Sequence, residues 1–359
     1  MRRYHDPLFD TDQHRHPVLG FLLIFLVLLL AAGFLFNRIN NSRVRLEKQS
    51  VTVPTLPSSL ENFRILQISD LHGLRFGQGQ ERLAAALQGV SYDIVCLTGD
   101  LTGPDGDTEA LTELLSLFTG KQVYFISGDE DPEPLWAIPH GNDTALADYI
   151  LRAQDAGAVY LDAPVKITRG SGVLWLSPEW VYTLDAEGSQ TALTERKAEL
   201  EKEAPSAERT AALTAVDYQL DRLSRIRAMR REVAKGDVHI ALTHHPLQKS
   251  AMASLREWTE TDNDSYISTV SLVLAGHYVS GQWVLPLLGP VRAPESAETG
   301  NGGWFPGTEN VTGLTDFYGI PQYISPGLGA SSAIGLPGFR LFNTPTVSLI
   351  TLTSKLIFK

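Results

Sequence analysis

Apolar and polar positions along residues 63–130 predict strands that alternate with helices. Strand-like alternation and buried apolar runs mark the strands, and amphipathic segments lie between them. In chain order the predicted elements are strand 63–69, helix 81–87, strand 94–98, helix 108–118 and strand 123–127. Strands that alternate with helices indicate βαβ units and a parallel or mixed sheet.

After about residue 155 the pattern changes to short strands joined by hairpins. The predicted strands in this half are 159–161, 165–168, 173–176, 239–242, 271–274 and 346–352. Residues 191–235 interrupt them with a stretch rich in Ala, Glu, Lys, Arg and Leu. This stretch predicts one or two solvated helices, broken near Pro205. We treat it as an insertion to which no chemistry is assigned.

Near the N-terminus, Val18 to Phe36 forms an uncharged run rich in Leu, Phe, Ile and Val. As a helix this run reaches about 28 Å, close to the hydrocarbon thickness of a bilayer. A buried core helix is the alternative, but such a helix usually keeps one polar face. A cleaved signal peptide is disfavoured because Ala31, Ala32 and Gly33 lie inside the apolar run. We therefore predict a tail over 1–17, a transmembrane helix over 18–37, a linker over 38–60 and one domain over 61–359.

Composition excludes several classes of protein. The 30 Lys+Arg against 41 Asp+Glu leave a net charge of −11, which argues against a broad nucleic-acid-binding face. Cys96 is the only cysteine, so an intramolecular disulfide and a thiolate-rich metal site are both impossible. Cys96 itself lies in an apolar run and is predicted to be a small buried hydrophobe. An acidic chain of this kind suits clustered carboxylates that hold cations.

Carboxylates and histidines follow the predicted strand ends. The residues are Asp70, His72, Asp100, Asp129, His244 and His277. Each short motif taken alone occurs by chance in many proteins, but their order and placement point to one edge of an α/β sheet. Mixed carboxylate and imidazole ligands suit Mn²⁺, Fe or Zn²⁺, and a shared Asp can hold two ions. Two such ions can clamp a phosphate and activate a water.

These stretches resemble the calcineurin-like metallophosphoesterases, in particular their membrane-anchored bacterial branch. The matching segments are Ile68-Ser-Asp-Leu-His72, Leu97-Thr-Gly-Asp-Leu101, Ser127-Gly-Asp-Glu-Asp131, Leu242-Thr-His-His-Pro246, Ala275-Gly-His-Tyr-Val-Ser-Gly-Gln282, Ser325-Pro-Gly-Leu-Gly329 and Asn343-Thr-Pro-Thr-Val-Ser-Leu-Ile-Thr-Leu352. The resemblance covers about residues 62–353. It implies an α/β fold, a four-layer α/β/β/α sandwich, preceded here by one N-terminal transmembrane helix.

The resemblance also implies two metal positions. The first metal position would be formed by Asp70, His72 and the shared Asp100. The second metal position would be formed by Asp100 with the side chains Asp129, His244 and His277. The second would bind more tightly, since it has four ligands. One or two divalent ions (Mn, Fe or Zn) are expected per chain.

Two positions depart from the family pattern. Glu130 stands where the family usually has a histidine that resembles a general acid, and Val279 stands where it usually has a metal-binding histidine. If the chain hydrolyses a phosphoester, Glu130 or His140 is predicted to supply the proton to the leaving oxygen. His140 as an ordinary surface-loop residue is the alternative.

Two functions remain open on the sequence. One is a membrane-anchored, metal-dependent phosphoesterase that hydrolyses a phosphomonoester or phosphodiester, with a lipid-linked substrate as one option. The other is a catalytically impaired pseudoenzyme that keeps the fold as a binding or regulatory module. The expected partners are a phosphorylated small molecule or lipid and the membrane through 18–37, with no nucleic acid. We expect residues 1–17 in the cytoplasm and the catalytic domain outside it, although the basic residues on the two flanks are nearly even in number.

Overall fold

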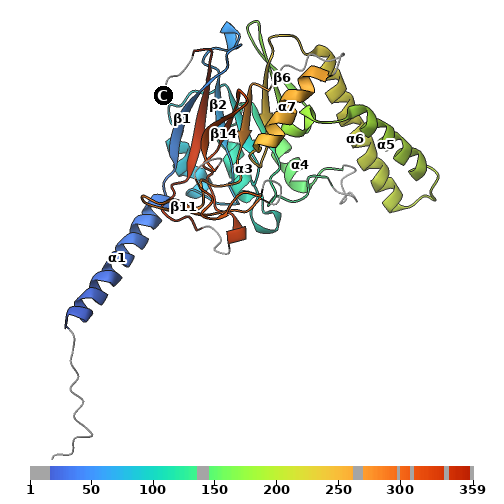
Figure 1. Ribbon diagram of the computed structural model, residues 1–359. Coiled ribbons are helices and arrows are strands. Elements are labelled where there is room, and N and C mark those ends of the chain that lie inside the picture. The colour runs from blue at the N-terminus through green and yellow to red at the C-terminus, as the bar shows by residue number, and fades with distance from the viewer. Residues whose placement is uncertain are drawn as a thin grey trace, which may run out of the picture.

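Two six-stranded sheets packed face to face form the body of the protein (Figure 1). The structure is a computed structural model, and it describes residues 17–135, 145–261, 270–296, 300–307, 311–334 and 339–355. A long helix, α1 (Pro17–Asn41), projects from one edge of this body.

The first sheet is built mainly from parallel strands. Across the sheet the order is β1 (Arg45–Thr52), β15 (Thr346–Thr353), β2 (Arg64–Ile68), β3 (Ile94–Thr98), β4 (Val123–Ile126) and β5 (Ala158–Tyr160). Strands β2 to β5 are parallel, whereas β15 is antiparallel to β2 and parallel to β1. The carboxyl ends of β2, β3 and β4 therefore lie at the same edge as the amino ends of β1 and β15.

The second sheet mixes both strand directions. Its order is β13 (Gly313–Phe317), β14 (Ile320–Ile324), β9 (Leu272–Ala275), β8 (Val238–Leu242), β7 (Gly172–Pro178) and β6 (Val165–Arg169). The four central strands are parallel, and β13 and β6 are antiparallel edge strands. A small third sheet contains β10 (Trp283–Leu285), β11 (Gly289–Ala293) and β12 (Gly303–Trp304).

Alternate side chains of the central strands enter two different cores. In β3, Ile94 and Cys96 face the core between the sheets, whereas Val95 and Leu97 face the core under the helices. Both sets are buried, which explains why this strand has no polar face in the sequence. Cys96 is a buried hydrophobe as predicted, and burial raises the pKa of its thiol.

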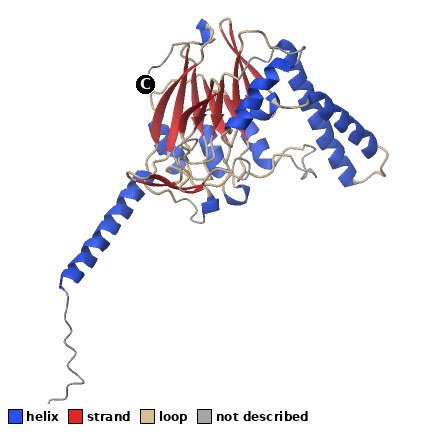
Figure 2. Cartoon of the chain, viewed as in Figure 1, coloured by secondary structure: helices blue, strands red, loops and turns tan. Residues whose placement is uncertain are grey.

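Helices cover the outer faces of both sheets (Figure 2). Helices α2 (Glu81–Ala86), α3 (Glu109–Ser116) and α4 (Asp148–Asp155) pack on the first sheet. Helices α6 (Ala207–Glu232) and α7 (Lys249–Thr261) pack on the second, and α5 (Ala186–Leu200) pairs with α6 as a projecting hairpin. The four-layer α/β/β/α sandwich is thus confirmed. Of the one or two helices predicted in the charged insertion, the structure has two, with Pro205 between them.

Two local predictions are corrected by the strand pairing. The segment 38–60 is not a linker, because α1 continues to Asn41 and β1 then pairs along its whole length with β15. Parallel pairing with a C-terminal strand cannot be recognised from local sequence. The strand predicted at 159–161 is not part of a hairpin either, since β5 is parallel to β4 in the first sheet.

Candidate metal centre

The loops that follow five parallel strands bring all six predicted ligands to one edge of the sandwich. Strands β2, β3 and β4 end just before Asp70, Asp100 and Asp129, and strands β8 and β9 end just before His244 and His277. Hydrogen bonds join the two sheets here: the backbone N–H of His277 donates to Asp70 Oδ1 at 2.8 Å, and Gln67 Nε2 donates to the carbonyl of Ala275 at 2.9 Å.

Two glycines allow these loops to approach one another. A Cβ on Gly128 would lie 2.1 Å from Asp100 Oδ1, and one on Gly276 would lie 1.9 Å from Ser69 Oγ. The ligand-bearing turns are also strained, because Asp70, Asp100 and His277 all have positive φ angles of 55°, 53° and 73°. Such conformations cost about 1–3 kcal/mol each and cluster at functional sites. The strained backbone at these three residues therefore supports a functional role for this edge of the sandwich.

The second metal position has its donors in close contact. His244 Nε2 lies 2.7 Å from Asp129 Oδ1 and 3.1 Å from Asp100 Oδ2. His277 Nδ1 lies 3.3 Å from the same Asp129 oxygen. His244 Nδ1 donates to the carbonyl of Thr98 at 2.9 Å, which directs Nε2 into the cluster. His245 joins this group, with Nε2 at 3.7 Å from Asp129 Oδ1.

The first metal position is less compact. Its side chains fall into two groups that share Asp100: Asp70 lies with Asp100 and His244, and His72 lies with Asp100 and Glu130. His72 Nε2 is 3.7 Å from Asp100 Oδ2. Val279, where the family usually has a histidine ligand, is fully buried at a φ of 50° and offers no donor atom.

Several buried donor atoms at this edge have no hydrogen-bond partner in the protein. They are Asp70 Oδ2, His72 Nε2 and His277 Nε2. An unsatisfied buried polar atom typically costs about 1–3 kcal/mol, and more when the group is charged. Bound cations would satisfy Asp70 Oδ2 and His72 Nε2, and this mixture of carboxylate and imidazole donors suits Mn²⁺, Fe or Zn²⁺. The residues present therefore fit divalent metal ions.

The carboxylates of this edge favour the protonated form of His244 in the metal-free protein. Burial lowers the pKa of His244, but the neighbouring Asp100, Asp129 and Asp70 carboxylates outweigh burial and raise that pKa well above its usual value. The histidines in turn hold the pKa of Asp129 far below its usual range, although burial acts in the opposite direction. A divalent ion would replace these protons as the positive charge of the cluster.

Glu130 is held as a hydrogen-bond acceptor. Its carboxylate accepts from Ser331 Oγ, from Ser332 Oγ at 2.9 Å and from the Ser332 backbone at 3.2 Å. Its Oε2 lies 3.4 Å from His72 Nδ1. Partial burial raises the pKa of Glu130, but His72 and the serines outweigh burial and lower it to about 2. The side chain is thus an ionised carboxylate beside a candidate metal ligand.

Some residues of the site were not recognisable in the sequence. Asp131 is buried, and it fixes the turn by accepting hydrogen bonds from Leu101, Thr102 and Gly128. Ser331 and Ser332 carried no motif at all. His245 and Asp131 carried the available signal, since both lie within segments that resemble the family. His140, the other candidate proton donor, lies outside the described residues.

A pocket of about 340 Å³ opens beside the second metal position. Asp129, His244 and His245 line one side, and Tyr160, Trp180 and Arg222 contribute to the remaining wall. Arg222 comes from α6 of the insertion, and its guanidinium lies 4.8 Å from the centre of the Trp180 ring. Its Nε is buried without a hydrogen-bond partner. The insertion therefore brings a cation into the pocket that adjoins the metal centre.

Comparison with known proteins identifies the family of the chain. The profile of the family described as calcineurin-like phosphoesterase matches residues 63–281, more than half of the chain. No curated protein matches the chain. Among solved structures, a phosphopantetheinyl hydrolase from Mycobacterium tuberculosis aligns over 75% of this chain and 91% of its own, with 13% identity and a TM-score of 0.34. The chain belongs to the calcineurin-like phosphoesterase family.

Proposed function

We propose that the protein is a membrane-anchored, metal-dependent phosphoesterase that hydrolyses a phosphomonoester or phosphodiester. The observation that carries this proposal is the convergence of Asp and His side chains from two sheets, with Asp100 between the two metal positions. The unpaired atoms of Asp70 and His72 support cation binding. One or two Mn, Fe or Zn ions per chain fit this donor set.

Side chains of the protein would position the metal ions and the substrate. Bound divalent ions would polarise a phosphoryl oxygen and lower the pKa of a water molecule. Asp100 holds the two metal positions together, and the Thr98 carbonyl fixes the ring of His244. Arg222 lies in the adjoining pocket, where it is suited to bind an anionic oxygen of the substrate. Glu130 is ionised, so as the predicted proton donor to the leaving group it would first have to take up a proton; His140 is the other predicted donor.

The direct test combines metal analysis with a substrate panel. We expect the purified full-length chain to retain one or two divalent ions and, with added Mn²⁺, to hydrolyse members of a panel of phosphomonoesters and diesters. Arg222→Gln should raise KM more than it lowers kcat. Glu195→Gln, which changes an exposed residue of α5, is the matched control. A metal-free chain that is inactive across the panel would contradict the proposal.

A pseudoenzyme is the second candidate, and Val279 favours it. A buried valine stands where the family usually has a ligand, so the first metal position has only Asp70, His72 and the shared Asp100. In this case the fold would act as a binding or regulatory module. Binding of a phosphorylated compound without turnover, at full metal occupancy, would support this second candidate.

The N-terminal helix supports a membrane location. The part of the chain that the structure describes has one helix long and apolar enough to cross a bilayer, Gly20–Asn41. A signal sequence is the alternative function of such a helix. We propose a single-pass protein with residues 1–17 in the cytoplasm and the catalytic domain outside. Protease added to intact cells should cleave the domain, and protection of the domain would reverse this orientation.

A further inference from the structure

Four large apolar side chains are exposed together in the small third sheet. In the turn between β10 and β11, Leu287 is 107% exposed and Leu288 is 74% exposed. At β12, Trp304 is 64% exposed and Phe305 is 71% exposed. We call these four residues the apolar surface. Outside α1, the only other large hydrophobic residues exposed in the described parts of the chain are Val159 and Tyr318. Such a concentration marks an interaction site.

The third sheet is connected directly to the end of α1. Asn37 and Asn41 donate side-chain hydrogen bonds to the carbonyl of Arg340 at 2.9 and 2.6 Å. The next residue, Leu341, accepts a hydrogen bond from the backbone N–H of Val284 in β10 at 2.9 Å. One short segment therefore lies between the apolar helix and the sheet that bears the apolar surface, and Figure 1 shows β11 beside the end of α1.

Aromatic rings extend this connection. Phe36 of α1 lies 6.1 Å from Phe342, measured between ring centres. Trp283 lies 6.3 Å from Phe339 and 6.1 Å from Trp304. Aromatic side chains are enriched where a membrane protein meets the polar headgroups. Ring contacts thus lead from Trp304 of the apolar surface to the segment that packs against α1.

The metal centre occupies the same edge of the molecule. Since β1 is antiparallel to β2, its first residue and the end of α1 lie at the edge where β2, β3 and β4 end. β1 is separated from β2 by one strand, so Asp70 is offset from the start of β1 by about 10 Å across the sheet. The loop that carries His277 runs into β10, and Asn343 donates to the carbonyl of Val279 at 2.6 Å.

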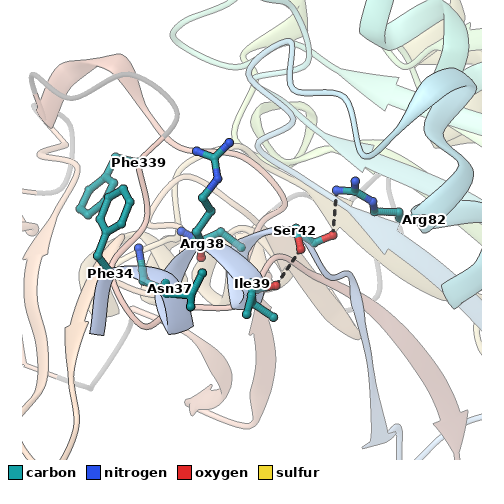
Figure 3. A pocket seen from close by; sticks show the side chains of 9 residues that line it. Phe34, Asn37, Arg38, Ile39, Ser42, Arg82 and Phe339 are labelled. Carbon is teal, nitrogen blue, oxygen red and sulfur yellow. Dashed lines mark hydrogen bonds between the residues drawn. The ribbon is translucent and has the colours of Figure 1, made fainter. Parts of the chain in front are cut away.

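A pocket at the junction of α1 and the domain combines cations with apolar groups (Figure 3). Phe34, Ile39 and Phe339 contribute its apolar lining, and Arg38 and Arg82 contribute positive charge. Arg82 also donates to the carbonyl of Ser42 at 3.2 Å. Basic residues next to a membrane helix are attracted to anionic lipid headgroups. The junction is therefore complementary to a phospholipid surface in both polarity and charge.

We propose that the apolar surface lies in the interfacial layer of the bilayer that α1 spans, and that the metal centre acts on phosphoesters carried by lipids at that surface. The second part rests on the proposed phosphoesterase function; the first does not. The metal centre would then meet a substrate whose apolar part stays in the membrane. A soluble phosphoester and a second copy of this chain are the other possible occupants, and the tests distinguish them.

The depth of the apolar surface in the bilayer can be measured independently of enzymatic activity. Nitroxide labels at Leu287→Cys and Leu288→Cys, in the full-length chain in phosphatidylcholine nanodiscs, should be more accessible to oxygen than to a water-soluble nickel chelate. The control label is Ser171→Cys, in the turn where β7 begins at the opposite edge, and it should show the reverse. Nickel accessibility at all three positions, or shielding of Leu287 and Leu288 from both reagents by a second copy, would overturn the proposal.

Turnover distinguishes the source of the phosphoester. The probes are phosphatidic acid and phosphatidylglycerol in vesicles, compared with soluble p-nitrophenyl phosphate. Replacing both Leu287 and Leu288 with Asp should lower the ratio of lipid to soluble turnover about tenfold, since two apolar side chains leave the interface. Turnover of the soluble ester alone by the wild-type chain would overturn the lipid substrate. Inactivity toward all probes would instead contradict the phosphoesterase function, while the label depths still decide the membrane contact.

Discussion

The two metal positions occupy one sheet edge but differ in how completely the chain supplies their donors. At the second metal position, Asp129, His244 and His277 lie in mutual contact, and His245 adjoins them. At the first, Asp70 and His72 approach Asp100 from separate groups, and Val279 supplies no donor. One sheet edge therefore carries a compact and a depleted candidate cation position side by side. The first depends on the shared Asp100 and on the carboxylate of Glu130 behind His72.

Removing the shared carboxylate of Asp100 should impair both metal positions. We expect Asp100→Ala to lower kcat/KM by more than about 100-fold, because the loss of a ligand should exceed the 10–100-fold effect of an outer-shell change. Metal analysis should show that both ions are weakened. Asp221→Ala, which removes an exposed carboxylate from α6, should retain normal activity. Equal activity of the two variants would show that Asp100 is not shared.

Metal titration should distinguish the two metal positions by their affinity. Wild-type protein is expected to bind one ion tightly and a second weakly. Asp129→Ala should remove the tight ion, whereas Asp70→Ala should remove only the weak one. Calorimetry together with elemental analysis would measure both. Retention of the tight ion by Asp129→Ala would reject the assignment of the second metal position.

Glu130 should act on the first metal position through His72. A carboxylate that holds a histidine ligand typically contributes about 10–100-fold to metal affinity or activity. We expect Glu130→Gln to weaken the weak ion by that amount and to leave the tight ion bound. If Glu130 instead donates the catalytic proton, kcat should fall by about 10²–10⁴-fold with both ions retained. His140→Ala tests the other candidate donor, and an unchanged rate and pH profile would exclude it.

Replacing Val279 with histidine should reduce the difference in affinity between the two metal positions. Val279 has a φ of 50°, a left-handed conformation that is unfavourable for a β-branched residue and more acceptable for histidine. We expect Val279→His to tighten the weak ion by about tenfold, the lower end of the 10–100-fold effect of an outer-shell partner, since the position is fully buried. Val279→Leu controls for side-chain volume. No gain over Val279→Leu would show that this position does not face the ion.

The smallest predicted effect is the pH dependence of metal binding. The pKa of His244 is raised in the metal-free fold, so its contribution to stability is present below about pH 6.5 and is lost as pH rises through the raised value. A metal ion must displace this proton, and its affinity should therefore increase with pH. Melting curves should show that the gain in Tm from Mn²⁺ grows from pH 5.5 to 8. A constant gain would contradict protonation of His244 in the metal-free protein.

Local sequence was sufficient for the parts of this protein that depend on nearby residues. Strands β2, β3 and β4 could be predicted because each is a short apolar run with a turn at its end. The six candidate ligands could be predicted because each follows a strand directly, and parallel strands end at a common edge. The helical hairpin of the insertion could be predicted from its composition and from the break at Pro205.

Tertiary structure alone decided the features that depend on distant pairing. β1 looked like a linker because its strand partner, β15, lies just over 300 residues away in the chain. Ser331 and Ser332 reach Glu130 across a separation of 201 or more residues, so no local pattern marks them. The exposure of Leu287, Leu288, Trp304 and Phe305 was equally hidden, because an apolar residue in sequence is compatible with either a core or a surface. Which of these occurs depends on what the folded chain leaves uncovered, here beside the end of α1.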